Sequence, residues 1–338
     1  MAGPSGQADG GLRGQIAFPA VQVVTNLASC PWPTGRAVIT IGAYDGVHLG
    51  HRAVISQVRR RAADEGCISA VVTFDRHPAS VVRPESAPRL LTNLEQKLEL
   101  LESTGVDATV IVPFDDARSR ETPVDFVEEI IVAALRTRTV IVGRDFHFGH
   151  MRQGNVTLLR EMGERHDFSC EPLVLVPRGD GVDEPVSSTA IRRALAGGEI
   201  DTATRMLGRP HEVRGAVVSG DKRGRTIGFP TANVEVPNGM CLPSDGVYAG
   251  IYRRPDGSEH VCAINLGRRP TFYAHAEHSL LEAYLLDFEG DLYGETAAVQ
   301  FLAFLRSERQ FGGIDELKAQ LDLDIEHARD AVLVRRAG

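Results

Sequence analysis

Two histidines stand three residues apart in a glycine-rich turn. Before the turn, the apolar run Ala37–Ile41 predicts a buried strand, and after it residues 52–58 have the spacing of an amphipathic helix. A turn between a strand and a helix presents free backbone N–H groups and the positive end of the helix dipole to an anion. His48 and His51 can both face that point from the first helical turn, and Gly50 leaves room for a phosphate. Imidazoles in this position donate hydrogen bonds to phosphate oxygens, which favours chemistry at phosphorus.

The same His-x-x-His spacing also occurs in ordinary strand–helix turns, where two half-buried histidines bind nothing. The preceding strand and the glycines of the turn favour the phosphate site over this alternative. The other residues of the turn that we expect to bind phosphate are Gly42, Tyr44, Asp45 and Gly46.

Apolar runs alternate with helical segments across the first half of the chain. The alternation predicts a mostly parallel, Rossmann-like α/β sheet with helices on both faces. In such sheets, ligands bind beyond the C-terminal ends of the strands. The expected strands are residues 37–41, 69–74, 109–112, 139–142 and 173–176, and the expected helices are residues 94–101, 124–135 and 158–164.

Polar and aromatic side chains follow three of these strands. Simpler interpretations exist for each, because Asp75 can cap a turn and Phe146 and Phe148 can belong to the core. Ser188 or Thr189 can likewise be a plain helix cap. Their collection at one edge of the sheet favours ligand binding. The residues concerned are Phe74, Asp75, His77 and Pro78 after the second strand, Asp145, Phe146 and Phe148 after the fourth, and Ser187, Ser188, Thr189 and Arg192 after the fifth.

The last of these groups has the chemistry of a second phosphate site. Ser187, Ser188 and Thr189 place hydroxyl groups at an expected helix start. Arg192 follows one helical turn later, where its guanidinium can bind the same anion.

The pattern changes after residues 203–207. Short strand-like segments at 213–218, 247–252, 260–265, 279–286 and 297–304 alternate with Gly, Pro and Asp turns. This arrangement predicts an antiparallel barrel or sandwich, which two terminal helices at 314–321 and 325–335 would follow. We therefore expect one domain at 16–207 and a second at 208–338, after a flexible tail over the first fifteen or so residues.

The loop at 220–233 combines glycines, basic residues and neutral oxygen donors. Its glycines let the backbone bend around phosphates, and its basic side chains supply positive charge. Thr231 and Asn233 suit Mg²⁺, which takes few protein ligands beside phosphates and water. The spacing differs from that of a P-loop, so a basic hairpin loop is the alternative. The phosphate-binding candidates are Gly220, Lys222, Arg223, Gly224, Arg225 and Gly228.

A strand over residues 281–288 alternates so that Glu282 and Tyr284 share one face. A carboxylate there can accept a proton from an alcohol that attacks the γ-phosphate of a nucleotide. For an isolated glutamate, a paired surface residue is the more common interpretation.

Composition restricts the class of protein. The 338 residues are 43% hydrophobic and 24% charged, which is ordinary for a globular protein of two domains. A formal charge of −8 argues against broad nucleic-acid binding. The five scattered cysteines fit reduced thiols in a cytoplasm better than a disulfide framework, and no apolar run is long enough to cross a membrane.

Motifs of both halves resemble one family, the bacterial bifunctional riboflavin kinases/FAD synthetases. Residues 42–51 resemble the Gly-x-x-Asp-Gly-Val-His-x-Gly-His turn of its adenylyltransferase half, and residues 187–192 its Ser-Ser-Thr-x-Ile-Arg motif. Residues 224–233 resemble the Gly-Arg-x-x-Gly-Phe-Pro-Thr-Ala-Asn signature of riboflavin kinase, and residues 282–294 the strand of its catalytic base. The resemblance extends from about residue 21 to residue 334, with the motifs in the family order.

The resemblance implies a function for most of these residues. Glu282 would be the kinase base, and Thr231 and Asn233 would hold Mg²⁺. The flavin would lie near the segments that follow the second and fourth strands and, in the kinase domain, near Asp245, Tyr248 and Asn265, although turn chemistry also explains the last segments. Adenylylation would rest on positioning and charge neutralisation by His48, His51, Ser188, Thr189, Arg192 and Mg²⁺, because a phosphate nucleophile is already ionised.

Two positions depart from the family pattern. Tyr44 replaces the usual phenylalanine, and Arg76 replaces the usual proline beside the expected flavin site. A riboflavin kinase with a weakened adenylyltransferase domain is therefore one alternative, and a non-catalytic flavin-binding protein is another. The partners implied are ATP, riboflavin and FMN, for a cytoplasmic protein that is a monomer or a homo-oligomer and binds neither nucleic acid nor membrane.

Overall fold

The computed structural model describes residues 21–32, 34–173, 177, 181, 183–220, 224, 227–268 and 279–337. The tail expected over residues 1–15 lies outside these ranges, as do Lys222, Arg223 and Arg225.

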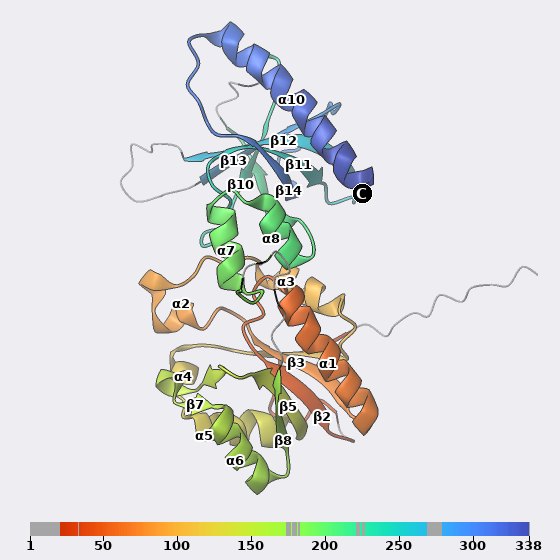
Figure 1. Ribbon diagram of the computed structural model, residues 1–338, viewed down its shortest axis with the longest axis vertical. Helices are drawn as coiled ribbons and strands as arrows, with labels where there is room; N and C mark the ends of the chain where they lie inside the picture. The colour runs from red at the N-terminus through yellow and green to blue at the C-terminus, as the bar shows by residue number, and fades with distance from the viewer. Residues whose placement is uncertain are drawn as a thin grey trace, which may run out of the picture.

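A six-stranded parallel sheet forms the first domain, at the bottom of Figure 1. The strand order is β1-β4-β3-β2-β5-β8. The strands are β1 (Gln22–Val24), β2 (Ala37–Ile41), β3 (Ile68–Phe74), β4 (Ala108–Val112), β5 (Thr137–Gly143) and β8 (Ser169–Leu173), beside a small hairpin of β6 (His147–Phe148) and β7 (Gly154–Asn155). The helices up to the second domain are α1 (Leu49–Glu65), α2 (Ala79–Val82), η1 (Pro84–Ser86), α3 (Leu94–Glu102), α4 (Asp116–Ser119), α5 (Pro123–Phe126), η2 (Val127–Ala134), η3 (His150–Arg152), α6 (Val156–His166), α7 (Ser188–Ala196) and α8 (Ile200–Leu207).

Both faces of this sheet are covered because its central strands are apolar on both sides. Val38 of β2 packs against α1, whereas its neighbour Ile39 packs against η2 and α6. A strand buried on both faces reads as a continuous apolar run, which is how β2 was predicted. The predicted α/β class is therefore confirmed.

Two strands differ from the sequence prediction. The last strand begins at Ser169 and is described as far as Leu173, so it starts four residues earlier than predicted, and residues 174–176 of the prediction lie outside the described ranges. β8 is an edge strand with a polar sequence that includes Pro172, and the apolar pattern therefore missed it. The three-residue β1 at the opposite edge was not predicted at all, because it is short and mostly exposed.

The second domain is a closed antiparallel barrel, at the top of Figure 1. Its strand order is β10-β13-β12-β11-β14-β9, and its sequence was predicted as a barrel or sandwich. The strands are β9 (His211–Val218), β10 (Ala232–Glu235), β11 (Gly246–Arg253), β12 (Glu259–Arg268), β13 (Ser279–Leu285) and β14 (Thr296–Arg306). β10 was not predicted, and its first two residues fall in the loop expected at 220–233.

One long helix follows the barrel, where two were predicted. α10 runs from Ile314 to Ala337 without a break. Asp322 and Asp324 interrupt the apolar spacing, but Asp324 points inward and pairs with Arg306 at the end of β14, through N–O distances of 2.6 to 3.1 Å. The interruption is thus a buried ion pair that fixes the helix to the barrel.

The two domains share a hydrophobic core. α7 and α8 lie between them in Figure 1, and apolar residues of both helices belong to the same buried cluster as the barrel interior. Two backbone hydrogen bonds of 2.7 Å also join the domains, from Leu90 N to Gly239 O and from Cys241 N to Leu90 O. Arg214 of β9 adds a two-pronged ion pair with Glu99 of α3.

A buried histidine at this junction makes stability depend on pH. His211 Nε2 lies 2.8 Å from Cys241 O, and burial lowers the pKa of His211 to about 4 from an ordinary 6.5. Between about pH 6.5 and about pH 4 the unfolded chain therefore takes up a proton that the folded chain does not. The free energy of unfolding should fall through this window as the pH falls, by up to about 3 kcal/mol from this residue.

Urea unfolding of the wild type and of His211→Asn at several pH values measures this effect. The variant should lose less stability on acidification than the wild type, because contributions from other histidines cancel in the comparison. Equal pH slopes for the two proteins would contradict the assignment to His211.

Within the described ranges, none of the helices combines the length and apolar character that a membrane span requires. The five cysteines are all free thiols.

Candidate functional site

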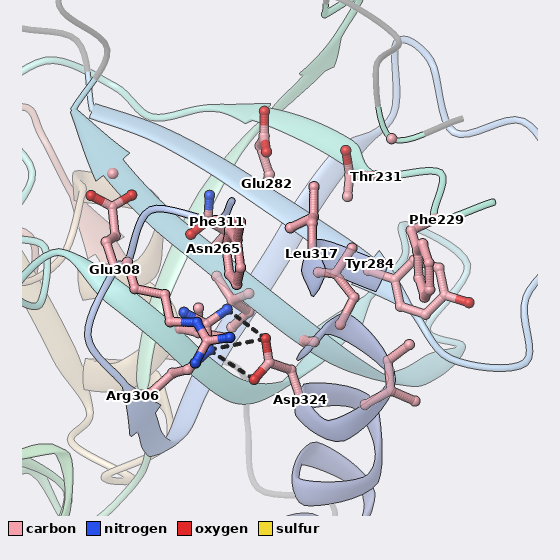
Figure 2. A pocket seen from close by; sticks show the side chains of 18 of the residues that line it. Phe229, Thr231, Asn265, Glu282, Tyr284, Arg306, Glu308, Phe311, Leu317 and Asp324 are labelled. Atoms are coloured by element: carbon pink, nitrogen blue, oxygen red, sulfur yellow. Dashed lines mark hydrogen bonds and ion pairs between the residues drawn. The ribbon is translucent and has the colours of Figure 1, made fainter. Parts of the chain in front are cut away.

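A cavity of about 780 Å³ lies between the outer face of the barrel and α10. Its wall comes from β10, β12 and β13, and its other side from the segment 306–311 and from α10. Figure 2 shows Glu282 and Thr231 on the barrel side and Phe311 and Leu317 on the helix side. Five of the residues predicted for the kinase site line it: Gly224, Thr231, Asn233, Asn265 and Glu282.

Strand register explains why three of these residues meet. Asn233 of β10 pairs with Glu282 of β13, and Glu282 pairs in turn with Asn265 of β12. The three side chains therefore form one row across adjacent strands. Leu281 and Ala283 alternate with Glu282 and fill the barrel core, so the row faces the cavity.

The residues present fit a magnesium ion. Asn233 is buried, and its side-chain Oδ1 has no hydrogen-bond partner. A buried carbonyl oxygen without a partner is costly unless a ligand completes it. Thr231 lines the same cavity two residues earlier, with the neutral oxygen that Mg²⁺ accepts.

The absence of a side chain at Gly220 leaves room for the side-chain amide of Asn233. A Cβ atom on Gly220 would lie 2.4 Å from Asn233 Nδ2. Gly220→Ala should therefore displace Asn233 and slow FMN formation by about tenfold to a hundredfold, since small displacements in a reacting centre have effects of this size. Rates of FMN formation measured beside adenylylation of supplied FMN test this, and the second rate should not change.

Gly313→Ala is the matched control, because nothing lies within 4 Å of the added Cβ. Equal FMN formation by Gly220→Ala and the wild type would show that Asn233 is not needed where it stands.

Two residues that were predicted to bind the flavin do not lie on the wall of this cavity. Tyr248 is fully buried in the barrel core, where its ring packs on Phe301 and Phe304 and its hydroxyl donates to Ser244 O. Neither Tyr248 nor Asp245 lines the cavity. Gly228 adopts a left-handed conformation with φ of +96° beside Phe229, which does line it.

The far end of the cavity carries charge that the sequence did not single out. Figure 2 shows the Arg306–Asp324 pair, which lines the cavity together with Glu308. Burial, together with the charge of Asp245, raises the pKa of the Glu308 carboxyl. The guanidinium carbon of Arg309 lies 4.7 Å from the centre of the Phe311 ring, and both residues line the cavity.

The second candidate site is the turn between β2 and α1. The rings of His48 and His51 stack with centres 3.6 Å apart, and His48 Nδ1 accepts a hydrogen bond from His51 N at the helix start. His48 is therefore the N-cap of α1. Gly50 fits beneath it, since a Cβ there would lie 3.1 Å from the His48 ring.

The backbone of this turn is strained. Tyr44 has φ of 50° and Val47 φ of 38°, a left-handed conformation that is unfavourable for a β-branched residue. Strain of this kind persists where the surroundings fix it, and it is concentrated at functional sites. Here the strained turn brings both histidines to one side of the helix start.

Both histidines are held neutral. Burial, then the charges of Arg209 and Arg192, lower the pKa of His48 to about 4. Burial, then His48 and Lys97, lower the pKa of His51 well below its ordinary value, and its Nδ1 is buried without a partner. The imidazoles thus act as hydrogen-bond donors at neutral pH, and the nearby positive charge comes from arginine and lysine.

Asp45 connects the turn to two other segments. Its carboxylate accepts hydrogen bonds from Leu91 N at 3.0 Å and Thr92 N at 3.1 Å, and it pairs with Arg192 of α7. Ser188 Oγ donates to Asp45 O at 2.9 Å. The two predicted phosphate motifs therefore meet, with Ser187 as the N-cap and Thr189 in the first turn of α7.

The end of β3 lies beside the same turn. Lys97 of α3 donates to Phe74 O at 2.7 Å and reaches Ala43 O at 3.4 Å. Burial lowers the pKa of Lys97 to about 8, although Asp45 and Asp75 oppose the shift. A small pocket here is also lined by Asp45, Asp75 and His77, with Pro78 next in the chain.

The aromatic residues after β5 form a stack of their own. Phe146 and Phe148 lie 5.5 Å apart and nearly parallel, and Phe126 lies 5.7 Å from Phe148. Phe146 and Phe148 are half-buried against the core of the first domain. Their position is compatible both with core packing and with ligand binding. Asp145 beside them is exposed.

The two departures from the family pattern are accommodated. The extra hydroxyl of Tyr44 lies 2.7 Å from Thr40 Oγ1, in the interior. Arg76 is exposed and pairs with Asp75 at 3.2 Å. Neither side chain blocks the turn that holds His48 and His51.

Comparisons with known proteins agree with this geometry. A family model for FAD synthetase matches residues 31–190, and one for riboflavin kinase matches residues 207–332. A solved structure named a macrolide-efflux protein from Streptococcus pneumoniae has a TM-score of 0.80 at 27% identity and covers 91% of this chain and 99% of its own.

Curated relatives extend over both domains. A bifunctional riboflavin kinase/FMN adenylyltransferase of Listeria monocytogenes is 38% identical over 88% of this chain and 93% of its own. Proteins of the same name from Bacillus subtilis and Escherichia coli are 35% and 36% identical, over 87% and 92% of this chain and 92% and 96% of theirs. The chain thus belongs to the family of bifunctional riboflavin kinases/FMN adenylyltransferases.

Proposed function

We propose that this protein phosphorylates riboflavin to FMN in its barrel domain and adenylylates FMN to FAD in its α/β domain. The observation that carries the proposal is the row of Asn233, Glu282 and Asn265 on one wall of a large cavity, in the same chain as the His48–His51 turn. We assign adenylylation to residues 16–207 and the kinase to residues 208–338. α7 and α8 belong to the first by sequence but pack on the barrel.

In the kinase site, Glu282 is the general base. Its carboxylate accepts the proton of the riboflavin 5′-hydroxyl as that oxygen attacks the γ-phosphate of ATP, and ADP leaves. Asn233 and Thr231 would hold Mg²⁺, which neutralises phosphate charge when bound. Gly220, Gly224 and Gly228, with the basic residues 222, 223 and 225, would lie along the phosphates.

In the adenylyltransferase site, an FMN phosphate oxygen attacks the α-phosphate of ATP. The new P–O bond forms as the bond to the β-phosphate breaks, and pyrophosphate leaves. His48 and His51 donate hydrogen bonds to the reacting phosphate, and Ser188, Thr189 and Arg192 bind the rest of the triphosphate. No side chain needs to remove a proton, which agrees with two histidines whose lowered pKa makes them weak bases.

The flavin of this second reaction would lie along Phe74, Asp75, His77 and Pro78 and along Asp145, Phe146 and Phe148. The aromatic stack at Phe146 and Phe148 offers a surface for an isoalloxazine ring. We place the protein in the cytoplasm, where its substrates ATP, riboflavin and FMN are available.

A single incubation tests the proposal. Purified protein with riboflavin, ATP and Mg²⁺ should yield FMN and then FAD, which chromatography separates. FMN without FAD, also when FMN is supplied, would leave only the kinase. No FMN at all would leave a flavin-binding protein. Neither alternative is favoured by a described contact, since Tyr44 and Arg76 are accommodated.

A further inference from the structure

An arginine of the linker between the domains lies beside the His48–His51 turn and makes no ion-pair contact with a described carboxylate. Arg209 donates to Gly46 O at 2.8 Å and approaches Leu207 O at 3.5 Å. Across the described ranges, no carboxylate lies within ion-pair distance of its guanidinium. Half-buried arginines elsewhere in the chain, such as Arg214 and Arg306, are paired with carboxylates.

The linker is held against the start of α1. Gly208 ends α8 with φ of +72°, and a Cβ at this position would lie 2.6 Å from Leu49 Cδ2. Leu49 follows His48 directly, and the left-handed backbone of residue 208, which favours glycine, brings the linker close to the turn. The position of Arg209 is therefore fixed by the fold and does not depend on a flexible surface side chain.

Several positive groups gather here. Burial, then the charge of Arg52, lowers the pKa of Arg209 to about 10, although the more distant carboxylates of Glu212 and Asp45 oppose the shift, so Arg209 stays protonated at neutral pH. Arg192 approaches the turn from α7, but Asp45 already neutralises it. A half-buried cation that contacts no carboxylate is unfavourable, and a bound anion relieves that cost.

We propose that Arg209 binds the pyrophosphate part of ATP, and then the pyrophosphate product, in the adenylyltransferase centre. The residues proposed for FMN follow β3 and β5. Arg209 belongs to the linker after α8 and approaches the turn from the side on which α1 begins. The guanidinium therefore faces the leaving-group end of the reaction, where negative charge grows as the bond between the α- and β-phosphates breaks. Arg209 comes from the part of the chain that the riboflavin kinase model matches, so the second domain completes the site of the first.

This inference rests on the proposed adenylyltransferase function and is tested with Arg209→Met and Arg209→Lys in the full chain. For Arg209→Met we expect the KM for ATP in adenylylation and the inhibition constant of inorganic pyrophosphate each to rise about tenfold or more. Arg209→Lys should lie between this variant and the wild type, because it keeps the charge but loses the fork. The KM for FMN and the kinase reaction should not change.

Arg205→Met is the matched control, since it removes an exposed arginine of α8 whose guanidinium donates to Thr202 Oγ1 on the same helix. Unaltered constants for ATP and pyrophosphate in Arg209→Met would overturn the inference. So would a fall in kcat alone, because that result would make Arg209 a residue that only positions the turn. Unchanged kinase activity shows that each variant is folded. If the wild type makes no FAD from FMN, the proposed function fails, and calorimetric titration with pyrophosphate still compares the wild type with the variant.

Discussion

Glu282→Gln is expected to lower the rate of FMN formation by about a hundredfold to ten-thousandfold, the usual contribution of a general base. The substitution keeps the size of the side chain and its place in the row with Asn233 and Asn265. Only the ability to accept the proton of the riboflavin hydroxyl is lost. FAD formation from supplied FMN should be unchanged, because the His48–His51 turn lies in the other domain.

Initial rates of both reactions on one preparation measure this effect. Glu235→Gln is the matched control, since Glu235 lies on the neighbouring strand β10, is exposed and does not line the cavity. Loss of both activities in Glu282→Gln would count against separate sites, and unchanged FMN formation would remove Glu282 as the base.

Features set by neighbours in the sequence were predictable. The alternation of Leu281, Glu282 and Ala283 gives the orientation of the base, and the barrel confirms it by burying both neighbours. The strand, turn and helix around His48 follow equally from local spacing, as does the N-cap of α1. These features depend on the backbone geometry of a few consecutive residues, which sequence periodicity reports directly.

Features set by distant segments were not predictable. Asp45 meets Arg192 across 147 positions of the chain, and Arg209 meets Gly46 across 163. Asp324 falls where the sequence predicts a break between two helices, but in the fold it pairs with Arg306 and the helix is continuous. Lys97 likewise has the spacing of a solvated helix residue, yet its ammonium group is buried at the end of β3. A sequence pattern carries no signal for partners that only the fold brings together.

His51→Ala is expected to lower FMN adenylylation by about a hundredfold to a thousandfold, the usual cost of losing one donor to a transition state. The ring of His51 is buried between His48 and Tyr44, with ring centres 3.6 and 4.8 Å away. Its removal takes away a donor but leaves the His48 Nδ1 cap, which is bonded to the backbone N–H of residue 51. Riboflavin phosphorylation should stay at the wild-type rate.

The protonation state of the pair gives this prediction a second readout. Because burial holds the pKa of His48 near 4 and that of His51 well below 6.5, neither ring loses a proton between about pH 6 and about pH 8. The ratio of wild-type to His51→Ala adenylylation should therefore be flat across this range. A ratio that falls as the pH rises through 6.5 would show that His51 acts in its protonated form. That result would support the charge-neutralising role implied by the family resemblance and would contradict a neutral hydrogen-bond donor. His166→Gln, a half-buried histidine of α6 near Glu128, is the control and should leave the rate unaltered at every pH. An unchanged rate for His51→Ala would remove this residue from the reaction.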